Sequence, residues 1–160
     1  MTLRLGFLAS GGGTNMQAIF DACTDGRLDG EPRVVIGNNS KSGALQRARD
    51  AGLPCFHLSG HTHPDAADLD AAICARLQEH DVQVVCLAGY MKLLRPIPAD
   101  FQGRVLNIHP ALIPAFAGKG FYGQRVHEAA LAAGVKVSGC TVHFVDDEYD
   151  HGPIVAQQAV

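Results

Sequence analysis

Short apolar segments alternate with segments of helical spacing along the whole chain, and this order restricts the fold more than any other feature. The apolar segments are residues 3–10, 32–38, 54–58, 82–88, 105–109, 140–145 and 154–159. Between two of them, Leu69, Ile73 and Leu77 recur at the spacing of one helix face. The alternation predicts an α/β protein with a Rossmann-like, doubly wound, mostly parallel sheet and helices on both faces.

The totals limit what such a chain can bind. With 160 residues and 47% hydrophobic content, we expect a single domain over residues 1–160. A net charge of -3 offers no basic face to nucleic acid, and no stretch is long and apolar enough to span a membrane. The cysteines lie in apolar stretches without Cys-x-x-Cys spacing, which predicts reduced core residues in a cytoplasmic protein. They are Cys23, Cys55, Cys74, Cys86 and Cys140.

The segment from Val105 to Pro110 ends a buried strand with two polar side chains. Asn107 and His109 are two residues apart, so in a strand both point to one face. Pro110 cannot continue a central strand, which places the pair at the carboxyl edge of the sheet, where α/β proteins bind ligands. The pattern alone leaves a second interpretation open, in which Asn107 caps a turn and His109 is a half-buried structural residue.

A glycine turn follows the first strand and precedes a helix. Gly11, Gly12 and Gly13 allow close approach of the backbone, and Thr14 or Asn15 is expected to cap the helix. Free N–H groups at a helix start favour a phosphate. The third glycine of a dinucleotide fingerprint and the Gly-Lys-Ser/Thr of a P-loop are both missing, so NAD and ATP are disfavoured. A single terminal phosphate fits better, although a turn that needs glycine only for its geometry remains possible.

Two further loops carry histidines and carboxylates. His61 and His63 could suggest a metal pair, but no third ligand follows at a recognisable spacing, and we expect no metal site. The acidic loop after the sixth predicted strand holds four carboxylates within residues 146–150. Only Asp150 lies close to a Gly-Pro turn that would fix its position.

These segments together resemble the folate-dependent formyltransferases. The resemblance lies in Leu-Asn-Ile-His-Pro at 106–110 and in Val-His-Phe-Val-x-x-x-x-Asp-x-Gly-Pro at 142–153. It is extended by Ser-Gly-Gly-Gly-Thr-Asn at 10–15 and by Leu-Ala-Gly-Tyr-Met at 87–91, and it covers essentially the whole chain. The resemblance implies transfer of the formyl group of 10-formyltetrahydrofolate to the amine of glycinamide ribonucleotide in purine synthesis, with no metal.

The resemblance also assigns roles to residues. It implies that Asn107 and His109 stabilise the oxyanion and that His109 and Asp150 manage proton transfer, while His143 supports Asp150. The ribonucleotide phosphate would be bound by Gly12, Gly13, Thr14 and Asn15. The folate would contact Met91, Lys92, Leu93, Leu94, Asn107, Val145 and Asp146. For Leu93 and Leu94 an ordinary core position, and for His143 a satisfied strand histidine, remain alternatives.

The chain departs from the family in two places. Some relatives carry a folate-contacting arginine at the start of the third helix, where this chain reads His63-Pro64-Asp65-Ala66-Ala67. Relatives also continue past the position of Val160, so the C-terminal end is expected to be truncated. Two other functions therefore remain open, a 10-formyltetrahydrofolate deformylase and a non-catalytic ribonucleotide-binding module. A monomer or a homodimer is expected.

Overall fold

The computed structural model describes residues 1–92 and 99–160, and its central element is a seven-stranded sheet with the strand order β3-β2-β1-β4-β5-β6-β7. The strands are β1 (Leu3–Ala9), β2 (Gly30–Gly37), β3 (Cys55–His57), β4 (Val84–Leu87), β5 (Val105–His109), β6 (Gly139–Phe144) and β7 (Ile154–Ala159). The helices are α1 (Thr14–Thr24), α2 (Gly43–Asp50), α3 (Ala66–Glu79), the 3-10 turn η1 (Ala99–Phe101) and α4 (Gln124–Ala133).

The first five strands are parallel and the last two are not. β3, β2, β1, β4 and β5 pair in parallel, whereas β6 pairs antiparallel with β5, and β7 antiparallel with β6. The prediction of a mostly parallel sheet is therefore confirmed, and the reversal at β6 is a feature that the alternation of segments did not indicate.

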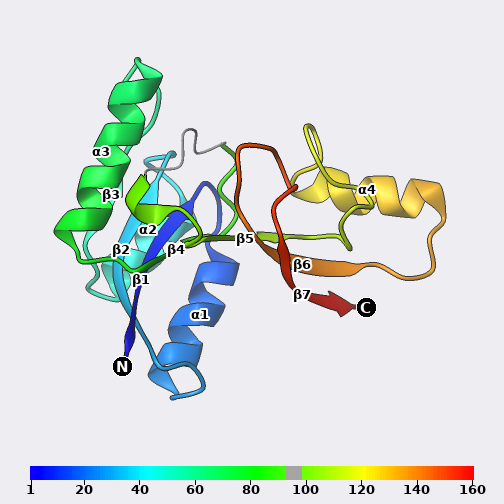
Figure 1. The fold of residues 1–160 in the computed structure, drawn as a ribbon, viewed down its shortest axis with the longest axis horizontal. Coiled ribbons are helices and arrows are strands. Elements are labelled where there is room, and N and C mark those ends of the chain that lie inside the picture. Colours follow the sequence, from blue (N-terminus) through cyan, green and yellow to red (C-terminus); the bar gives the residue numbers. More distant parts are fainter. Residues whose placement is uncertain (93–98) are drawn as a thin grey trace.

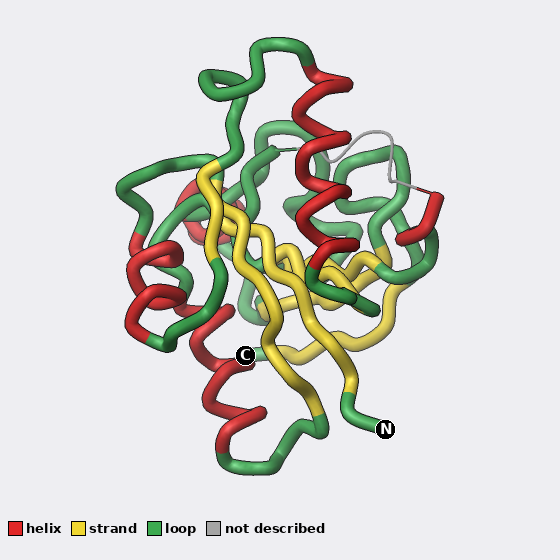
Figure 2. Tube along the Cα trace, turned by 90° about the vertical axis from the view of Figure 1, so that its left-hand side faces the viewer, coloured by secondary structure: helices red, strands yellow, loops and turns green. Residues whose placement is uncertain are grey.

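Helices lie on both faces of the strands (Figures 1 and 2). On one face, Ile73 and Leu77 of α3 pack with side chains of β1, β2 and β4. On the other face, Met16 and Phe20 of α1 pack with the α2 residue Leu45. The central strands are consequently buried on both sides, which explains why their sequences are almost continuously apolar.

Local signals set the ends of several helices. The Ser42 side chain accepts a hydrogen bond from the Leu45 N–H at the start of α2, and Asp65 accepts one from the Asp68 N–H at the start of α3. Helix α4 ends at Gly134, which adopts the left-handed conformation that glycine allows. These caps define where the three helices begin or end.

The turn before α1 differs from the prediction. Gly13, not Thr14 or Asn15, is the N-cap residue, with a φ of 75°, and no side chain caps the helix. A Cβ atom at Gly13 would lie 2.7 Å from the Cα atom of Ala44, so the turn packs tightly against the start of α2. The N–H groups of the first turn of α1 are therefore left without a capping side chain.

Candidate functional site

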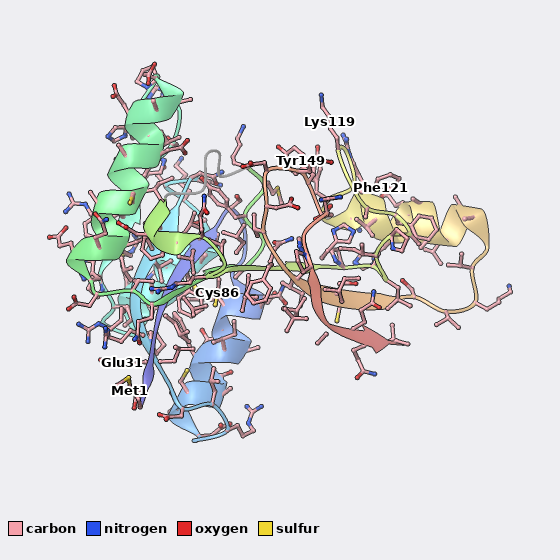
Figure 3. The ribbon with its side chains drawn as sticks, viewed as in Figure 1. Met1, Glu31, Cys86, Lys119, Phe121 and Tyr149 are labelled. Atoms are coloured by element: carbon pink, nitrogen blue, oxygen red, sulfur yellow. The ribbon has the colours of Figure 1, made fainter. Side chains whose placement is uncertain are left out.

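A cavity of about 680 Å³ lies at the carboxyl ends of β4 and β5. Its walls come from the end of β5, from β6 and from three loop segments, residues 89–92, 118–123 and 148–150. Figure 3 shows Lys119, Phe121 and Tyr149 on two of these loops, on the same side of the sheet. The volume lies in the range of small-molecule sites, which are about 300–1,000 Å³.

Antiparallel pairing places Asn107 of β5 directly opposite His143 of β6. The Nδ2 atom of Asn107 lies 3.1 Å from Nε2 of His143, and Nδ1 of His143 lies 2.9 Å from the Phe144 carbonyl oxygen. Because a carbonyl only accepts, Nδ1 of His143 carries the hydrogen, and Nε2 of the neutral ring accepts from Asn107. His143 is thus bonded to Asn107 more closely than to Asp150, whose Oδ1 lies 3.7 Å from Nε2.

The ring of His109 lies between two acceptors. Its Nε2 atom is 2.8 Å from the Phe116 carbonyl oxygen, and its Nδ1 atom is 3.4 Å from Oδ2 of Asp150. The side chain is only 4% exposed. Asn107 and His109, which the strand alternation placed on one face, therefore reach the two oxygens of the same carboxylate, since Asn107 Nδ2 is 3.4 Å from Asp150 Oδ1.

Asp150 has a left-handed backbone conformation, and its carboxylate is bound by groups from several segments. Its φ is 52°, and its Oδ2 atom accepts a hydrogen bond of 3.0 Å from the Gly118 N–H. The side chain is 10% exposed. The acidic loop that carries it is closed by a further exposed pair, with His151 Nδ1 2.7 Å from Asp146 Oδ2.

The cluster lowers the pKa of Asp150 and raises the pKa of His143. Burial acts to raise the pKa of Asp150, but His143, the Gly118 N–H and the charge of His109 outweigh it, and the pKa is lowered. Burial acts to lower the pKa of His143, but Asp150, the Phe144 carbonyl and Asp146 outweigh it, and the pKa is raised. The site therefore holds a carboxylate beside two imidazoles, as proton transfer requires.

The glycine turn contributes to the cavity at one residue. Asn15 lines the cavity, whereas Gly12, Gly13 and Thr14 are not among its lining residues. The Gly12 carbonyl accepts a hydrogen bond of 2.9 Å from Nε of Arg47, a cation that the sequence did not single out. Gly12 and Thr14 are exposed and Gly13 is buried.

The residues expected to contact a folate divide into three groups. Met91, Lys92 and Val145 line the cavity, as Asn107 does. Asp146 does not line it and instead pairs with His151. Leu93 and Leu94 lie outside the described residues.

Several cavity residues had no signal in the sequence. Tyr122, His127, Cys140 and Tyr149 line the cavity, and each of them belongs to a residue type with many structural roles. Gly118, which lines the cavity, and Phe116, which does not, contact Asp150 and His109 through backbone atoms, so their side-chain types carried no information about the site. Tyr90 also lines the cavity, and burial, with a contribution from Asp70, raises the pKa of its hydroxyl to about 12.

Residues 1–92 and 99–160 contain neither a metal-binding cluster nor a membrane-spanning helix. No group of three or more histidine, cysteine, aspartate or glutamate side chains there could hold a metal ion. Within the same residues, no helix has the length and apolar character needed to cross a membrane.

Comparison with known proteins gives consistent matches over nearly the whole chain. The chain is 41% identical to a chloroplastic phosphoribosylglycinamide formyltransferase of Arabidopsis thaliana, over 98% of its own length and 54% of that protein. The chain thus spans about half the length of the curated plant relatives it matches.

Solved structures give the same result. A glycinamide ribonucleotide transformylase from Symbiobacterium toebii superposes with a TM-score of 0.91 at 48% identity, covering 99% of this chain and 73% of that one. A formyltetrahydrofolate deformylase from Pseudomonas syringae is more distant, with a TM-score of 0.86 and 27% identity, covering 100% of this chain and 51% of that one. The family model described as formyl transferase matches residues 3–160. The chain therefore belongs to the formyl transferase family.

Proposed function

We propose that this protein transfers the formyl group of 10-formyltetrahydrofolate to the amine of glycinamide ribonucleotide, a step of purine biosynthesis. The observation that carries the proposal is the convergence of Asn107, His109 and Asp150 on one cavity of about 680 Å³. The family match and the names of the plant and Symbiobacterium relatives support the choice of donor and acceptor.

The reaction needs an oxyanion donor and a route for one proton. The ribonucleotide amine attacks the formyl carbon, a C–N bond forms, and the carbonyl electron pair moves onto oxygen. The attacking nitrogen then loses a proton, the leaving nitrogen of the folate gains one, and its bond to the formyl carbon breaks. The products are the formylated ribonucleotide and tetrahydrofolate, without any net gain or loss of protons.

Asn107 is the residue that can donate to the developing oxyanion. Of its two amide hydrogens, one is directed to His143 Nε2 at 3.1 Å and the other to Asp150 Oδ1 at the longer distance of 3.4 Å. The second, weaker contact can be exchanged for the formyl oxygen, while His143 keeps the amide in place. Removing one such donor from an enzyme typically costs on the order of 10²–10³-fold in rate.

His109 and Asp150 supply the charge and the proton route. When protonated, the His109 ring carries a positive charge next to the reacting centre and can donate to Asp150. Asp150, whose pKa is lowered, is a carboxylate at neutral pH and stabilises that ring. The pair can therefore accept a proton from the attacking nitrogen and return it to the leaving nitrogen.

The remaining substrate contacts follow from the walls of the cavity. Asn15 and the uncapped start of α1 are available to the ribonucleotide phosphate, because backbone N–H groups at a helix start attract anions. Met91, Lys92 and Val145 also line the cavity and are available to the folate. A cytoplasmic location stays a prediction, since the Arabidopsis relative is named as chloroplastic.

The test is an assay of formyl loss with and without the acceptor. The protein is mixed with 10-formyltetrahydrofolate, and tetrahydrofolate and formylated ribonucleotide are quantified in the presence and absence of glycinamide ribonucleotide. We expect turnover only when the ribonucleotide is present, with one formylated product for each folate consumed. Turnover that ignores the ribonucleotide would identify a deformylase, to which the Pseudomonas structure is similar. Binding of the ribonucleotide without any turnover would identify a binding module.

A further inference from the structure

Two residues that contact the His109 ring, Phe116 and Asp150, have an unusual backbone conformation. Among residues 1–92 and 99–160, three non-glycine residues have a positive φ, namely Asp81, Phe116 and Asp150. Phe116 has a φ of 50°, a region that bulky side chains rarely adopt. Residues kept in such conformations cluster at functional sites, and two of these three contact His109.

The conformation of Phe116 directs its carbonyl oxygen at His109, 2.8 Å from Nε2. The side chain points elsewhere, since its ring packs edge-on against Phe121 with a centroid distance of 6.3 Å, and Phe116 is not among the residues that line the cavity. The contact with the histidine is therefore made by the backbone, and a side-chain role is a separate hypothesis.

The segment that leads to Phe116 is held in place by a buried hydroxyl. Thr141 of β6 lies opposite His109 in the sheet and is fully buried. Its Oγ1 atom donates to the Ala111 carbonyl at 2.7 Å and accepts from the Ile113 N–H at 3.0 Å. Gln157 of β7 donates to both Thr141 Oγ1 and the Ile113 carbonyl at 3.0 Å. The strands that carry the site thus also fix the chain just before residue 116.

The carbonyl contact decides which nitrogen of His109 can exchange a proton. A carbonyl oxygen only accepts, so Nε2 must carry a hydrogen in every protonation state that keeps this bond. The other nitrogen, Nδ1, faces the Asp150 carboxylate at 3.4 Å. The proton that the ring gains or loses is then the one on Nδ1.

We propose that residue 116 is a positioning residue, whose left-handed backbone fixes the proton on Nε2 of His109 and assigns proton exchange to Nδ1, opposite Asp150. The inference deepens the proposed function and rests on it for its catalytic consequence. The structural part, the fixed tautomer, is a property of the free protein and can be measured without any substrate.

The test compares substitutions that keep or disfavour the backbone conformation. Phe116→Gly allows a positive φ freely and removes the whole side chain, whereas the β-branched Phe116→Val disfavours a positive φ and keeps an apolar side chain. A role in packing predicts that the glycine variant is the worse of the two. The proposal predicts the opposite order, with kcat of Phe116→Gly within about threefold of wild type. For Phe116→Val we expect kcat to fall on the order of 10²-fold with KM nearly unchanged.

The second readout is the tautomer itself. In ¹⁵N-labelled protein, the side-chain signals of His109 are identified by their loss in His109→Gln. We expect Nε2 to carry the hydrogen in wild type and in Phe116→Gly at every pH, and a mixture of tautomers in Phe116→Val. Phe116→Asn is a further variant that tolerates positive φ, and it should behave like Phe116→Gly even if the valine variant folds poorly.

The outcomes separate the two proposals. A wild-type tautomer in Phe116→Val, or a loss of the Nε2 hydrogen in both Phe116→Gly and Phe116→Asn, would overturn the positioning role whether or not the protein transfers formyl groups. The expected tautomers without any formyl transfer in wild type would leave the positioning role standing and remove the proposed function.

Discussion

The proposed substrate site has two ends that are built in different ways, and at the first of them only Asn15 lines the cavity. At one end, the turn of Gly11 to Asn15 offers backbone groups at the start of α1, and its tightest constraint is steric, the contact of Gly13 with Ala44. At the other end, Asn107, His109, His143 and Asp150 form a buried cluster of polar and charged side chains. The first end depends on shape and the second on charge. Substitutions at the first end should therefore change stability, and substitutions at the second should change catalysis.

The largest expected effect is at the charged end. In Asp150→Asn, the side chain keeps its size and tolerates the left-handed backbone, but the negative charge beside His109 is lost. We expect kcat to fall roughly 10²–10⁴-fold, the usual contribution of a positioned acid or base, with much less change in ribonucleotide affinity. Steady-state kinetics and calorimetric binding measure the two quantities.

The matched control is Asp147→Asn in the same loop. Asp147 is exposed, and its carboxylate forms no hydrogen bond or ion pair within the described part of the chain, so the same chemical change should leave kcat near wild type. Equal losses in both variants would mean that the charge of the whole loop matters, and Asp150 would lose its special role.

The next largest effect is a loss of stability on substitution of Gly13 in the glycine turn. In Gly13→Ala, the new Cβ meets Ala44 and the residue must keep a φ of 75°. We expect the free energy of unfolding to fall by about 1–3 kcal/mol, as for other overpacked sites, measured by urea denaturation. The neighbouring Gly12→Ala meets no atom within 4 Å, and its effect on unfolding should stay within about 0.5 kcal/mol. Similar losses at both positions would show that the turn is not limited by this contact.

The smallest effect is the pH dependence of stability, and it separates the two ends directly. The raised pKa of His143 stabilises the fold fully below the unfolded value of about 6.5, and this contribution is lost as pH rises through the folded pKa. The lowered pKa of Asp150 contributes above the unfolded value of about 3.9 and is lost as pH falls through its folded pKa.

The stability difference between wild type and Asp150→Asn should therefore be greatest at about pH 4.5–6 and should shrink towards pH 9. Urea denaturation at three pH values measures it. The difference between wild type and Gly13→Ala should be flat over this range, since its cause is steric. If the loss of stability in Gly13→Ala depended on pH, or the loss in Asp150→Asn did not, the contrast between the two ends would be removed.

The sequence was sufficient for the elements of the fold and for the strand-borne part of the site. Hydrophobic periodicity located the strands, and alternation placed Asn107 and His109 on one face because side-chain direction in a strand depends only on position. Thr141 and His143 are likewise two residues apart on β6, and both are buried. The reversal of β6 had no such signal, because strand direction depends on the path of the preceding loop and helix.

The loop-borne part of the site was less accessible. Asp150 stood out only because a Gly-Pro turn follows it closely, and Phe116 did not stand out, since a phenylalanine at positive φ contradicts the usual residue preferences. Thr14 and Asn15 were expected as helix caps on sound statistics, but the tight approach of α2 selected glycine for that position. Contacts made by backbone atoms leave little trace in a sequence.

The hydrogen bond from the Gly118 N–H to Asp150 joins two loops that are 32 residues apart in the chain. This bond has a consequence for motion. The loop after β5 and the loop after β6 cannot open independently while it is intact, so the two loops form one cooperative unit. The amide hydrogen of Gly118 is protected while this bond is intact, so we expect its rate of exchange with solvent to report the separation of the two loops.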